Sequence, residues 1–324
     1  MQNWGARIED WKNQCIAFFN PQSSFPNPRH HRQSSLLVVI SGASSGIGLA
    51  LARHYLQAGA QVAAFARRAD LLEQLASEFP QQVSVYALDV RDGVAVQHAA
   101  TDFIARVGVP HIVIANAGVS VGTLTEFAED IDAFQQVMDI NVLGMVKTFQ
   151  PFIGAMRDAA SGVPSPQPSD KTISHSTKLA NEQVAGYPIG RGSKREQHFT
   201  LVGIASVAGF RGLPGAGAYS ASKAAAISYL ESLRVELRST GIKVTTICPG
   251  YIRTPMTTHN PYPMPFMLDA DVAAARMARA IARQTSFTVI PWQMGVVGAL
   301  LKVLPRWLYD LLFAHAPHKP RQSD

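Results

Sequence analysis

Tyr219, Lys223 and Ser206 are the residues of this chain whose types and spacing could carry out chemistry together. Tyr219 and Lys223 are four residues apart, so a helix would place both side chains on one face. A free tyrosine has a pKa of about 10, too high for efficient proton transfer at neutral pH, and a nearby ammonium lowers that pKa. Ser206 follows an apolar run and could hold a carbonyl or hydroxyl group. The trio predicts proton transfer at a carbonyl or alcohol, although an isolated Tyr-x-x-x-Lys is more often an exposed helix pair.

A glycine-rich turn at residues 41–48 lies between a predicted strand and a predicted helix. Glycine lets a backbone bend sharply and approach a pyrophosphate, and the next helix offers free N–H groups and its positive dipole end. Glycine-rich loops are common, so the position between strand and helix is what favours a dinucleotide site. The predicted cofactor contacts of this turn are Gly42, Ser44, Ser45, Gly46, Ile47 and Gly48.

Arg67 and Arg68 end the second predicted strand, about 20 residues past the turn. A site for NAD normally has Asp or Glu there to bind the ribose hydroxyls, whereas arginine suits the additional phosphate of NADP. The missing acid favours NADP(H), with NAD(H) as the second choice. The other interpretation is two solvated arginines at the start of a helix.

Two more motifs follow the third and fourth predicted strands. Asp89 and Val90 follow the third strand, and Asn116, Ala117 and Gly118 follow the fourth. Asp, Asn and Gly also end strands for ordinary turn reasons, so neither motif alone distinguishes a cofactor site from a turn.

Short apolar runs alternate with helical patterns from residue 36 onward. The runs are continuously apolar, which is typical of strands covered on both faces. Strand–helix alternation predicts an α/β fold with a doubly wound, parallel, seven-stranded sheet in a single domain. The predicted strands are 36–40, 61–66, 83–87, 111–115, 200–205, 243–248 and 287–290, and the clearest predicted helices are 47–58, 71–78, 134–156 and 218–239.

Composition excludes several classes of function. The chain has 324 residues, is 47% hydrophobic and 16% charged, and carries a net charge of +6. Its basic residues are scattered with no recognisable reader module, so we expect no nucleic-acid binding. Two cysteines, Cys15 and Cys248, are too few for a disulfide framework or a metal cluster. Charged residues interrupt the apolar ones near the start, which predicts no signal peptide and a cytoplasmic location.

Three segments do not follow the strand–helix rhythm of the predicted domain at residues 35–290. They are an N-terminal extension at 1–34, a polar, proline-rich insertion at about 158–198, and a C-terminal tail at 291–324. A long connection without periodicity is usually a flexible excursion. The helix before the insertion should deliver the chain to the amino edge of the sheet, away from the ligand edge.

The C-terminal tail has an amphipathic helical pattern. Lys302, Arg306 and Asp310 fall on one stripe at steps of four, and Pro305 predicts a kink or the start of a second helix. Polar residues make the segment too interrupted to span a membrane. A helix that covers the sheet and pocket is favoured over one that docks on a membrane surface. The apolar positions are Val297, Leu300, Leu301, Leu304, Leu308, Leu311 and Leu312.

The chain resembles the short-chain dehydrogenase/reductase family in its common single-domain form. The resemblance covers about residues 36–290 and implies a Rossmann fold. One departure is Ser41, where the family usually has threonine, and both residues carry a hydroxyl. The matching residues, in the family's order, are Gly42, Gly46, Gly48, Asp89, Asn116, Ala117, Gly118, Asn141, Ser206, Tyr219, Lys223, Pro249, Gly250 and Thr254.

The resemblance implies a role for each catalytic position. Tyr219 is the acid/base, Ser206 orients the substrate, and Lys223 binds the nicotinamide ribose and tunes the tyrosine. Asn141 completes a proton relay through a bound water. The remaining implied cofactor contacts, near the nicotinamide carboxamide, are Pro249, Gly250, Ile252 and Thr254.

The sequence therefore predicts an NADP(H)-dependent oxidoreductase that interconverts a carbonyl and a secondary alcohol. The segment after Thr254 resembles the family's substrate lid, and its apolar residues Met256, Tyr262, Met264, Phe266 and Met267 indicate an apolar substrate. Packing of these residues on the core is nearly as well supported. Alternatives are a nucleotide-sensing regulator without turnover and a membrane-surface enzyme that acts on lipids. We also expect a homo-oligomer.

Overall fold

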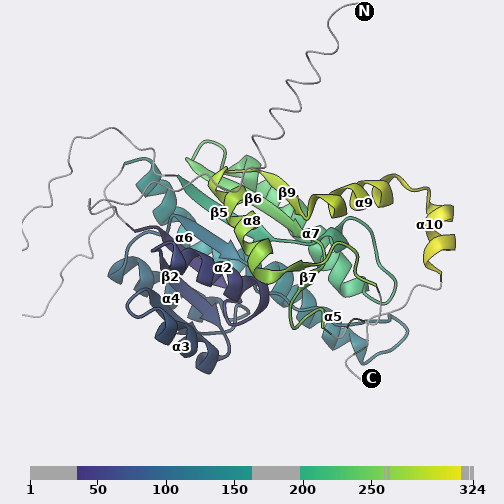
Figure 1. Ribbon diagram of the computed structural model, residues 1–324, viewed down its shortest axis with the longest axis horizontal. Coiled ribbons are helices and arrows are strands. Elements are labelled where there is room, and N and C mark those ends of the chain that lie inside the picture. The colour runs from purple at the N-terminus through teal and green to yellow at the C-terminus, as the bar shows by residue number, and fades with distance from the viewer. Residues whose placement is uncertain (1–34, 163–197, 259, 261–262, 315–320, 322–324) are drawn as a thin grey trace, which may run out of the picture. The chain divides into compact units, whose positions relative to one another are not determined.

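The computed structural model describes residues 35–162, 198–258, 260, 263–314 and 321, and its ribbon is shown in Figure 1. One parallel sheet of seven strands runs through it in the order β3-β2-β1-β4-β5-β6-β9, so the predicted fold class is confirmed. The register aligns Val38 of β1 with Val62 of β2 and Ile112 of β4. The strands are β1 (Leu37–Ser41), β2 (Gln61–Ala66), β3 (Val83–Ala87), β4 (Ile112–Ala115), β5 (Phe199–Ile204), β6 (Ile242–Pro249) and β9 (Phe287–Ile290).

Helices cover both faces of the sheet because its strands are apolar on both sides. On one face α2 (Gly46–Gln57), α3 (Ala69–Glu78) and α8 (Ala270–Ala282) bury a core of aliphatic side chains, and α2 and α8 contact each other (Figure 1). On the other face α4 (Gly93–Arg106), α6 (Gly144–Ala160) and α7 (Gly217–Glu236) enclose a core that contains Phe149 and Phe199. Two packed layers hold the strand ends in fixed positions.

The predicted helix at 134–156 is wrong as a single element. The structure divides this stretch into α5 (Asp130–Met138), a π-helical turn η1 (Asp139–Leu143) and α6. A π turn adds one residue to the helix and rotates the side chains within it. Asn141 lies in this turn, where its side chain is buried.

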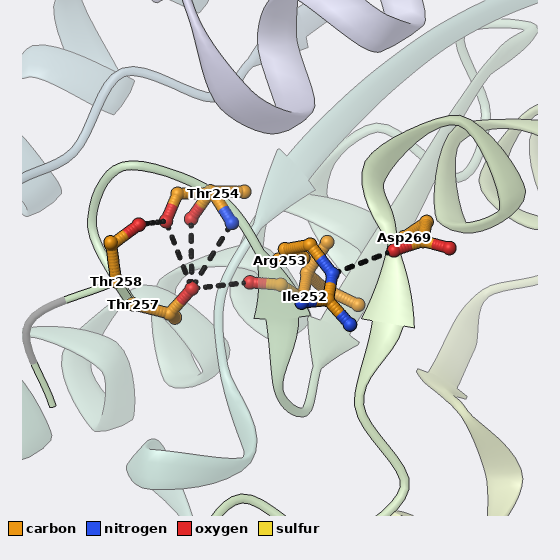
Figure 2. Close-up of polar contacts among 6 residues, drawn as sticks. All are labelled: Ile252, Arg253, Thr254, Thr257, Thr258 and Asp269. Carbon is orange, nitrogen blue, oxygen red and sulfur yellow. Dashed lines mark hydrogen bonds and ion pairs between the residues drawn. The ribbon is translucent and has the colours of Figure 1, made fainter. Parts of the chain in front are cut away.

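A second, small parallel sheet was not predicted. It pairs β7 (Ile252–Arg253) with β8 (Leu268–Asp269). The Arg253 guanidinium donates to the Asp269 carboxylate at 2.8 Å, as Figure 2 shows. The pair brackets the segment predicted to be a lid, so this segment leaves and rejoins the body at two adjacent strands.

The three added segments are described to different extents. The N-terminal extension at 1–34 lies outside the described residues, as does most of the insertion, at 163–197. Helix α6 continues to Ala160, four residues past the predicted end of that helix. A Cβ on Gly241, which precedes β6, would lie 2.9 Å from the Ala160 Cβ. The insertion therefore leaves the fold at the amino edge of the sheet, as expected.

The C-terminal tail forms two helices, α9 (Trp292–Val303) and α10 (Arg306–Phe313). Pro305 is the N-cap of α10, which confirms that it starts a second helix. In Figure 1, α9 runs away from the β9 edge of the sheet and α10 lies at its outer end; we call the two helices the C-terminal arm. Among the described residues, no helix is long and apolar enough to cross a membrane.

Candidate active site

A cavity of about 300 Å³ lies at the carboxyl edge of the sheet, where the strand order reverses between β1 and β4. Open α/β sheets bind ligands at such a switch point. All of the predicted site residues line this cavity except Gly48 and Asn141. Further lining residues that the sequence did not indicate include Phe65, Leu88, Val119, Ile140 and Thr257.

The glycine turn depends on close backbone packing. Gly42 and Gly46 have φ values of 70° and 57°, in the left-handed region that favours glycine. A Cβ on Gly48 would lie only 2.2 Å from the Gly42 carbonyl oxygen, so no side chain fits there. Gly48 therefore packs against the side of the turn that faces away from the cavity, and the other side of the turn lines the cavity.

Ser41 and Asn116 tie the glycine turn to the end of β4. The Ser41 hydroxyl accepts from the backbone N–H groups of Asn116 and Ala117 at 3.1 and 3.2 Å. The Asn116 amide donates to the carbonyl oxygens of Ser41 and Gly42 at 3.0 and 3.3 Å. Because a hydroxyl is all that these bonds need, the departure from threonine at position 41 leaves the arrangement intact.

A cationic region lies at the rim of the turn. Arg68 donates to the hydroxyl oxygens of Ser44 and Ser45 at 3.1 and 2.7 Å. Ser45 is the N-cap of α2, but its side chain makes no capping bond, and the first turn of α2 contains no acidic residue. Arg67 lines the same rim and is exposed. Free N–H groups, a positive helix end and two guanidinium groups suit a phosphate-rich ligand.

Asp89 and Val90 form the opposite wall beside β3. Arg91 donates to the Asp89 carboxylate at 2.7 Å, and this hydrogen bond lowers the carboxyl pKa. Asp89 is therefore a fixed anionic acceptor at neutral pH, next to the apolar Val90 and Leu88. An acceptor beside an apolar wall can bind an adenine amino group.

Ser206, Tyr219 and Lys223 meet at the other end of the cavity. Ser206 follows β5, and its hydroxyl accepts from the Ala208 N–H at 3.1 Å, which fixes its orientation. The Lys223 ammonium donates to the Ile204 carbonyl at 2.9 Å and lies 5.7 Å from the centre of the Tyr219 ring. All three side chains line the cavity, so the predicted trio is brought together.

The electrostatics of this trio differ from our expectation. We expected Lys223 to lower the pKa of Tyr219, but burial raises that pKa, and the opposing influence is a hydrogen bond with Ser206. Burial also lowers the pKa of Lys223 to about 8. Desolvation outweighs the charge of the lysine because both groups are deeply buried. Tyr219 is consequently protonated at neutral pH.

Asn141 lies behind the cavity wall. Its amide accepts from the Val119 N–H at 2.8 Å and donates to the Val119 carbonyl at 3.0 Å. It also donates to the hydroxyl of Ser222 at 2.9 Å, a buried residue that the sequence did not indicate. A Cβ on Gly118 would lie 3.2 Å from the Asn141 amide oxygen and 3.6 Å from the Lys223 ammonium, so Gly118 leaves space between these two groups.

The segment after β7 is held by one threonine that the sequence analysis missed. The Thr257 hydroxyl donates to the carbonyl oxygens of Ile252 and Thr254 at 2.8 and 3.0 Å, and accepts from the Thr254 N–H at 3.1 Å (Figure 2). A Cβ on Gly46 would lie 3.3 Å from the Thr254 methyl group. Thr257 therefore positions Thr254 against the glycine turn.

The predicted lid residues are only partly at the cavity. Met256 lines it, whereas Met264, Phe266 and Met267 do not, and Tyr262 lies outside the described residues.

Pro249, which ends β6, and the following Gly250 also line the cavity. The cavity is therefore continuous from the arginine rim, past the glycine turn, to Ser206.

The fold and this cavity define a class, the nucleotide-dependent oxidoreductases with a doubly wound sheet. The family model described as short chain dehydrogenase matches residues 36–163 and 194–262. The chain therefore belongs to the short-chain dehydrogenase/reductase family. It is an NAD(P)-dependent oxidoreductase that acts on CH–OH or C=O groups.

Relatives agree with this assignment, and a solved structure agrees with the fold. An uncharacterized oxidoreductase of Myxococcus xanthus is 33% identical over 84% of this chain and 94% of its own length. A 2-dehydro-3-deoxy-L-rhamnonate dehydrogenase (NAD(+)) of a Sphingomonas species is 29% identical over 71% of this chain and 77% of its own. A short chain dehydrogenase from Burkholderia cenocepacia in complex with NADP is similar in fold, with a TM-score of 0.66 and 20% identity over 88% of this chain and 99% of that one.

Proposed function

We propose that this enzyme uses NADP(H) in preference to NAD(H) to interconvert an apolar carbonyl compound and its secondary alcohol. The observation that carries the cofactor preference is the arginine rim at the end of β2. Arg68 is fastened to the glycine turn by two hydroxyl groups, and Arg67 stands beside it. A 2′-phosphate would find two guanidinium groups there, where an NAD site would offer a carboxylate.

The residues of the cavity fit a dinucleotide along its whole length. Asp89 and Val90 would hold the adenine end, the glycine turn with Ser44, Ser45 and Ile47 the pyrophosphate, and Asn116, Ala117 and Gly118 the sugar beyond it. When bound, the nicotinamide supplies or accepts the hydride at the substrate carbon. The residues that would hold it are Tyr219, Lys223, Pro249, Gly250, Ile252 and Thr254.

Ser206 and Tyr219 carry the substrate chemistry. Their hydroxyl groups hydrogen-bond to each other and line the cavity, so a carbonyl oxygen can lie between them and accept from both. In reduction, the Tyr219 O–H donates its proton to that oxygen, and Ser206 holds the oxygen while charge develops on it. Burial raises the pKa of Tyr219, so the residue holds this proton at neutral pH.

After reduction, the Tyr219 phenolate needs a new proton, and Lys223 would supply it. The Lys223 ammonium has a pKa of about 8, close to neutral pH, so it can give up a proton and take another from solvent. Asn141 lies beside it across Gly118 and is held rigid by Val119 and Ser222. This assignment makes Asn141 a positioning residue at the inner end of the relay.

The apolar character of the substrate is inferred from the walls around the trio. Val119, Ile204 and Met256 line the same cavity as Ser206 and Tyr219. Flexible methionine side chains adapt to apolar ligands of different shape. The location in the cytoplasm and the homo-oligomer stay predictions.

Turnover assays test the proposal. Ketones and aldehydes of graded chain length are offered with NADPH or NADH, and oxidation of the cofactor is followed by absorbance. We expect kcat/KM to rise with chain length and to be higher with NADPH. Tyr219→Phe keeps the ring and loses the proton, so activity should fall by a factor of about 10²–10⁴ while NADPH affinity changes little.

Two outcomes of these assays would contradict the proposal. Near-normal turnover by Tyr219→Phe would remove Tyr219 from its role as acid. NADPH binding without turnover of any carbonyl or alcohol would favour the nucleotide-sensing regulator. A sensor has no use for a buried tyrosine–lysine–asparagine relay, which is why the enzyme is preferred.

A further inference from the structure

Each helix of the C-terminal arm exposes large apolar side chains along one face. Trp292 is 68% exposed, Trp307 is 69% exposed and Leu311 is 70% exposed. We call these exposed side chains together the apolar stripe; its members are Trp292, Val296, Leu300 and Val303 of α9 and Trp307 and Leu311 of α10. Successive members are three or four residues apart, so within each helix they share one face.

The inner side of the arm is already occupied by the body of the protein. A Cβ on Gly298 would lie 2.2 Å from the Phe210 ring, and one on Gly250 would lie 2.5 Å from the Met294 side chain. Tyr309, in α10, is buried and donates to the carbonyl oxygen of Gly212. The apolar stripe is therefore the face that is left over after the arm has packed.

Three arginines lie next to the start of the stripe. Arg276, Arg279 and Arg283 of the α8 segment line a shallow surface hollow together with Trp292. All three arginines are exposed, and no carboxylate of the described residues forms an ion pair with any of them. We call this the arginine hollow. Lys302 and Arg306 add positive charge farther along the arm, where Asp310 is the one acidic residue between positions 292 and 314.

We propose that the apolar stripe and the arginine hollow together form a docking surface for an anionic phospholipid membrane. Tryptophan and leucine side chains beside lysine and arginine are the combination that inserts into the interface of a bilayer while cations contact lipid phosphates. The net charge of +6 adds a long-range attraction to such a surface. The arm lies in the interface and does not cross it.

Charge distinguishes a membrane from a second copy of the chain as the occupant. A twofold contact centred on the stripe near Trp292 would bring two arginine hollows toward each other, and like charges across an interface are unfavourable. Anionic lipid phosphates match both parts of the surface. Docking would also hold the carboxyl edge close to the bilayer, because Gly250 lines the cavity and packs on α9.

Co-sedimentation of the full-length protein with vesicles tests the proposal. Vesicles of phosphatidylcholine alone are compared with vesicles of phosphatidylcholine and phosphatidylglycerol, at low and high salt. We expect binding to the anionic vesicles that weakens as salt is raised. The double variant Trp307→Ser/Leu311→Ser should reduce partitioning at least about tenfold, because membrane burial of one large apolar side chain is worth about that factor.

A second variant isolates the contribution of charge. Arg276→Ala/Arg279→Ala/Arg283→Ala should weaken binding to anionic vesicles by about a hundredfold, since each basic residue near such a surface contributes a factor of about five. It should leave binding to neutral vesicles unchanged. The matched control is Arg234→Ala/Arg238→Ala/Lys243→Ala, which removes three exposed cations from another face and should change binding far less.

The apolar variant and the charge variant should both keep wild-type thermal stability and NADPH turnover of a water-soluble ketone, because their residues are exposed and lie outside the cavity. Failure of the proposed carbonyl chemistry would thus be seen separately from failure of docking. Two results would overturn the docking proposal: no wild-type binding to anionic vesicles, or unchanged binding by Trp307→Ser/Leu311→Ser. In the first case, a dimer in sedimentation that the same variant converts to a monomer would identify the stripe as an interface between copies.

Discussion

The cofactor end of the cavity and the C-terminal arm differ in how their residues find partners. At the cofactor end, Ser41 and Asn116 bind each other although they are 75 residues apart in sequence, because β1 and β4 are neighbouring strands and each residue follows or ends its strand. The arm is fastened by contacts across the chain. Arg211 donates to the carbonyl oxygens of Leu301 and Leu304 at 2.9 and 3.0 Å.

The glycine turn is therefore a closely packed part of the fold, whereas the arm is a peripheral element held on by a few contacts. The glycine turn has no space for an additional carbon atom at Gly48, whereas the arm leaves half of its large apolar side chains exposed. Substitutions at the turn should therefore act on cofactor binding and stability together. Substitutions in the arm should act locally and leave the turn unaffected.

The largest effect is expected at the turn. In Gly48→Ala the new Cβ meets the Gly42 carbonyl oxygen, which cannot move without displacing the turn. We expect a loss of at least about 2–3 kcal/mol, as for other overpacked sites, and a loss of NADPH affinity of about a hundredfold. Chemical denaturation and cofactor titration measure the two losses.

Gly154→Ala is the matched control for Gly48→Ala. Gly154 lies inside α6, and its Cβ would meet nothing within 4 Å. The free energy of unfolding should rise by about 0.5–1 kcal/mol, because alanine is the better helix former. If both variants behave alike, close packing does not govern the turn.

The second prediction concerns the arginine rim. Arg67→Ala/Arg68→Ala should weaken NADPH about ten- to hundredfold and leave NADH unchanged, because a charge-assisted hydrogen bond is worth about 1.5–3 kcal/mol. The control Arg234→Ala removes an exposed cation outside the cavity and should affect neither cofactor. Equal losses for NADPH and NADH would place the two arginines away from the ribose phosphate.

The sequence was sufficient for the sheet and for most of the residues that line the cavity, because both depend on short motifs. Strands β2, β3 and β9 begin and end where their apolar runs do, and the other four differ from the predicted bounds by one residue at one or both ends. The π turn at Asn141 escaped prediction because helical spacing continues on both sides of it. Thr257 also escaped, since threonine is common in loops and its three partners are backbone atoms.

The hydrophobic pattern of the arm predicts its helices but not which of their apolar residues are buried. The apolar positions of a tail helix indicate a buried stripe, and Val297, Leu301, Leu304 and Leu308 are indeed partly buried. Leu300 and Leu311 share the same pattern and are exposed, as is Trp307. Phe210 and Arg211, about 90 residues earlier in the chain, determine which apolar face of the arm packs on the body. The sequence of the arm itself contains no information about these contacts.

The third prediction is a pH dependence of stability. Burial lowers the pKa of Lys223 from 10.5 to about 8, so between these values the unfolded chain holds a proton that the folded protein has lost. The free energy of unfolding should therefore rise with pH from about 8 upward, by about 1 kcal/mol over the first pH unit. Denaturation of the wild type and of Lys223→Met between pH 7.5 and about 9 measures the difference, and Lys223→Met should lack the rise.

Cys248 sets the upper limit of this window. Burial raises the pKa of its thiol from 9.0 to about 12, so above pH 9 the folded protein keeps a proton that the unfolded chain loses. The contribution of Cys248 to stability should fall with pH from that point and offset the continued rise from Lys223. Cys248→Ala should extend the rise to higher pH. A wild-type curve parallel to that of Lys223→Met would mean that the lysine is not desolvated.

The smallest effect is expected where the arm is fastened. Tyr309 donates to the Gly212 carbonyl, and its ring lies under the Arg211 guanidinium, 4.4 Å from the ring centre. Tyr309→Phe keeps the ring and removes one hydrogen bond, worth about 0.5–1.5 kcal/mol. We expect faster amide hydrogen exchange in α10 and unchanged exchange in β1 and α2, because local opening of the arm does not reach the turn. If exchange also rises at the glycine turn, the arm and the glycine turn open as one unit. That result would contradict the prediction that the arm opens independently of the turn.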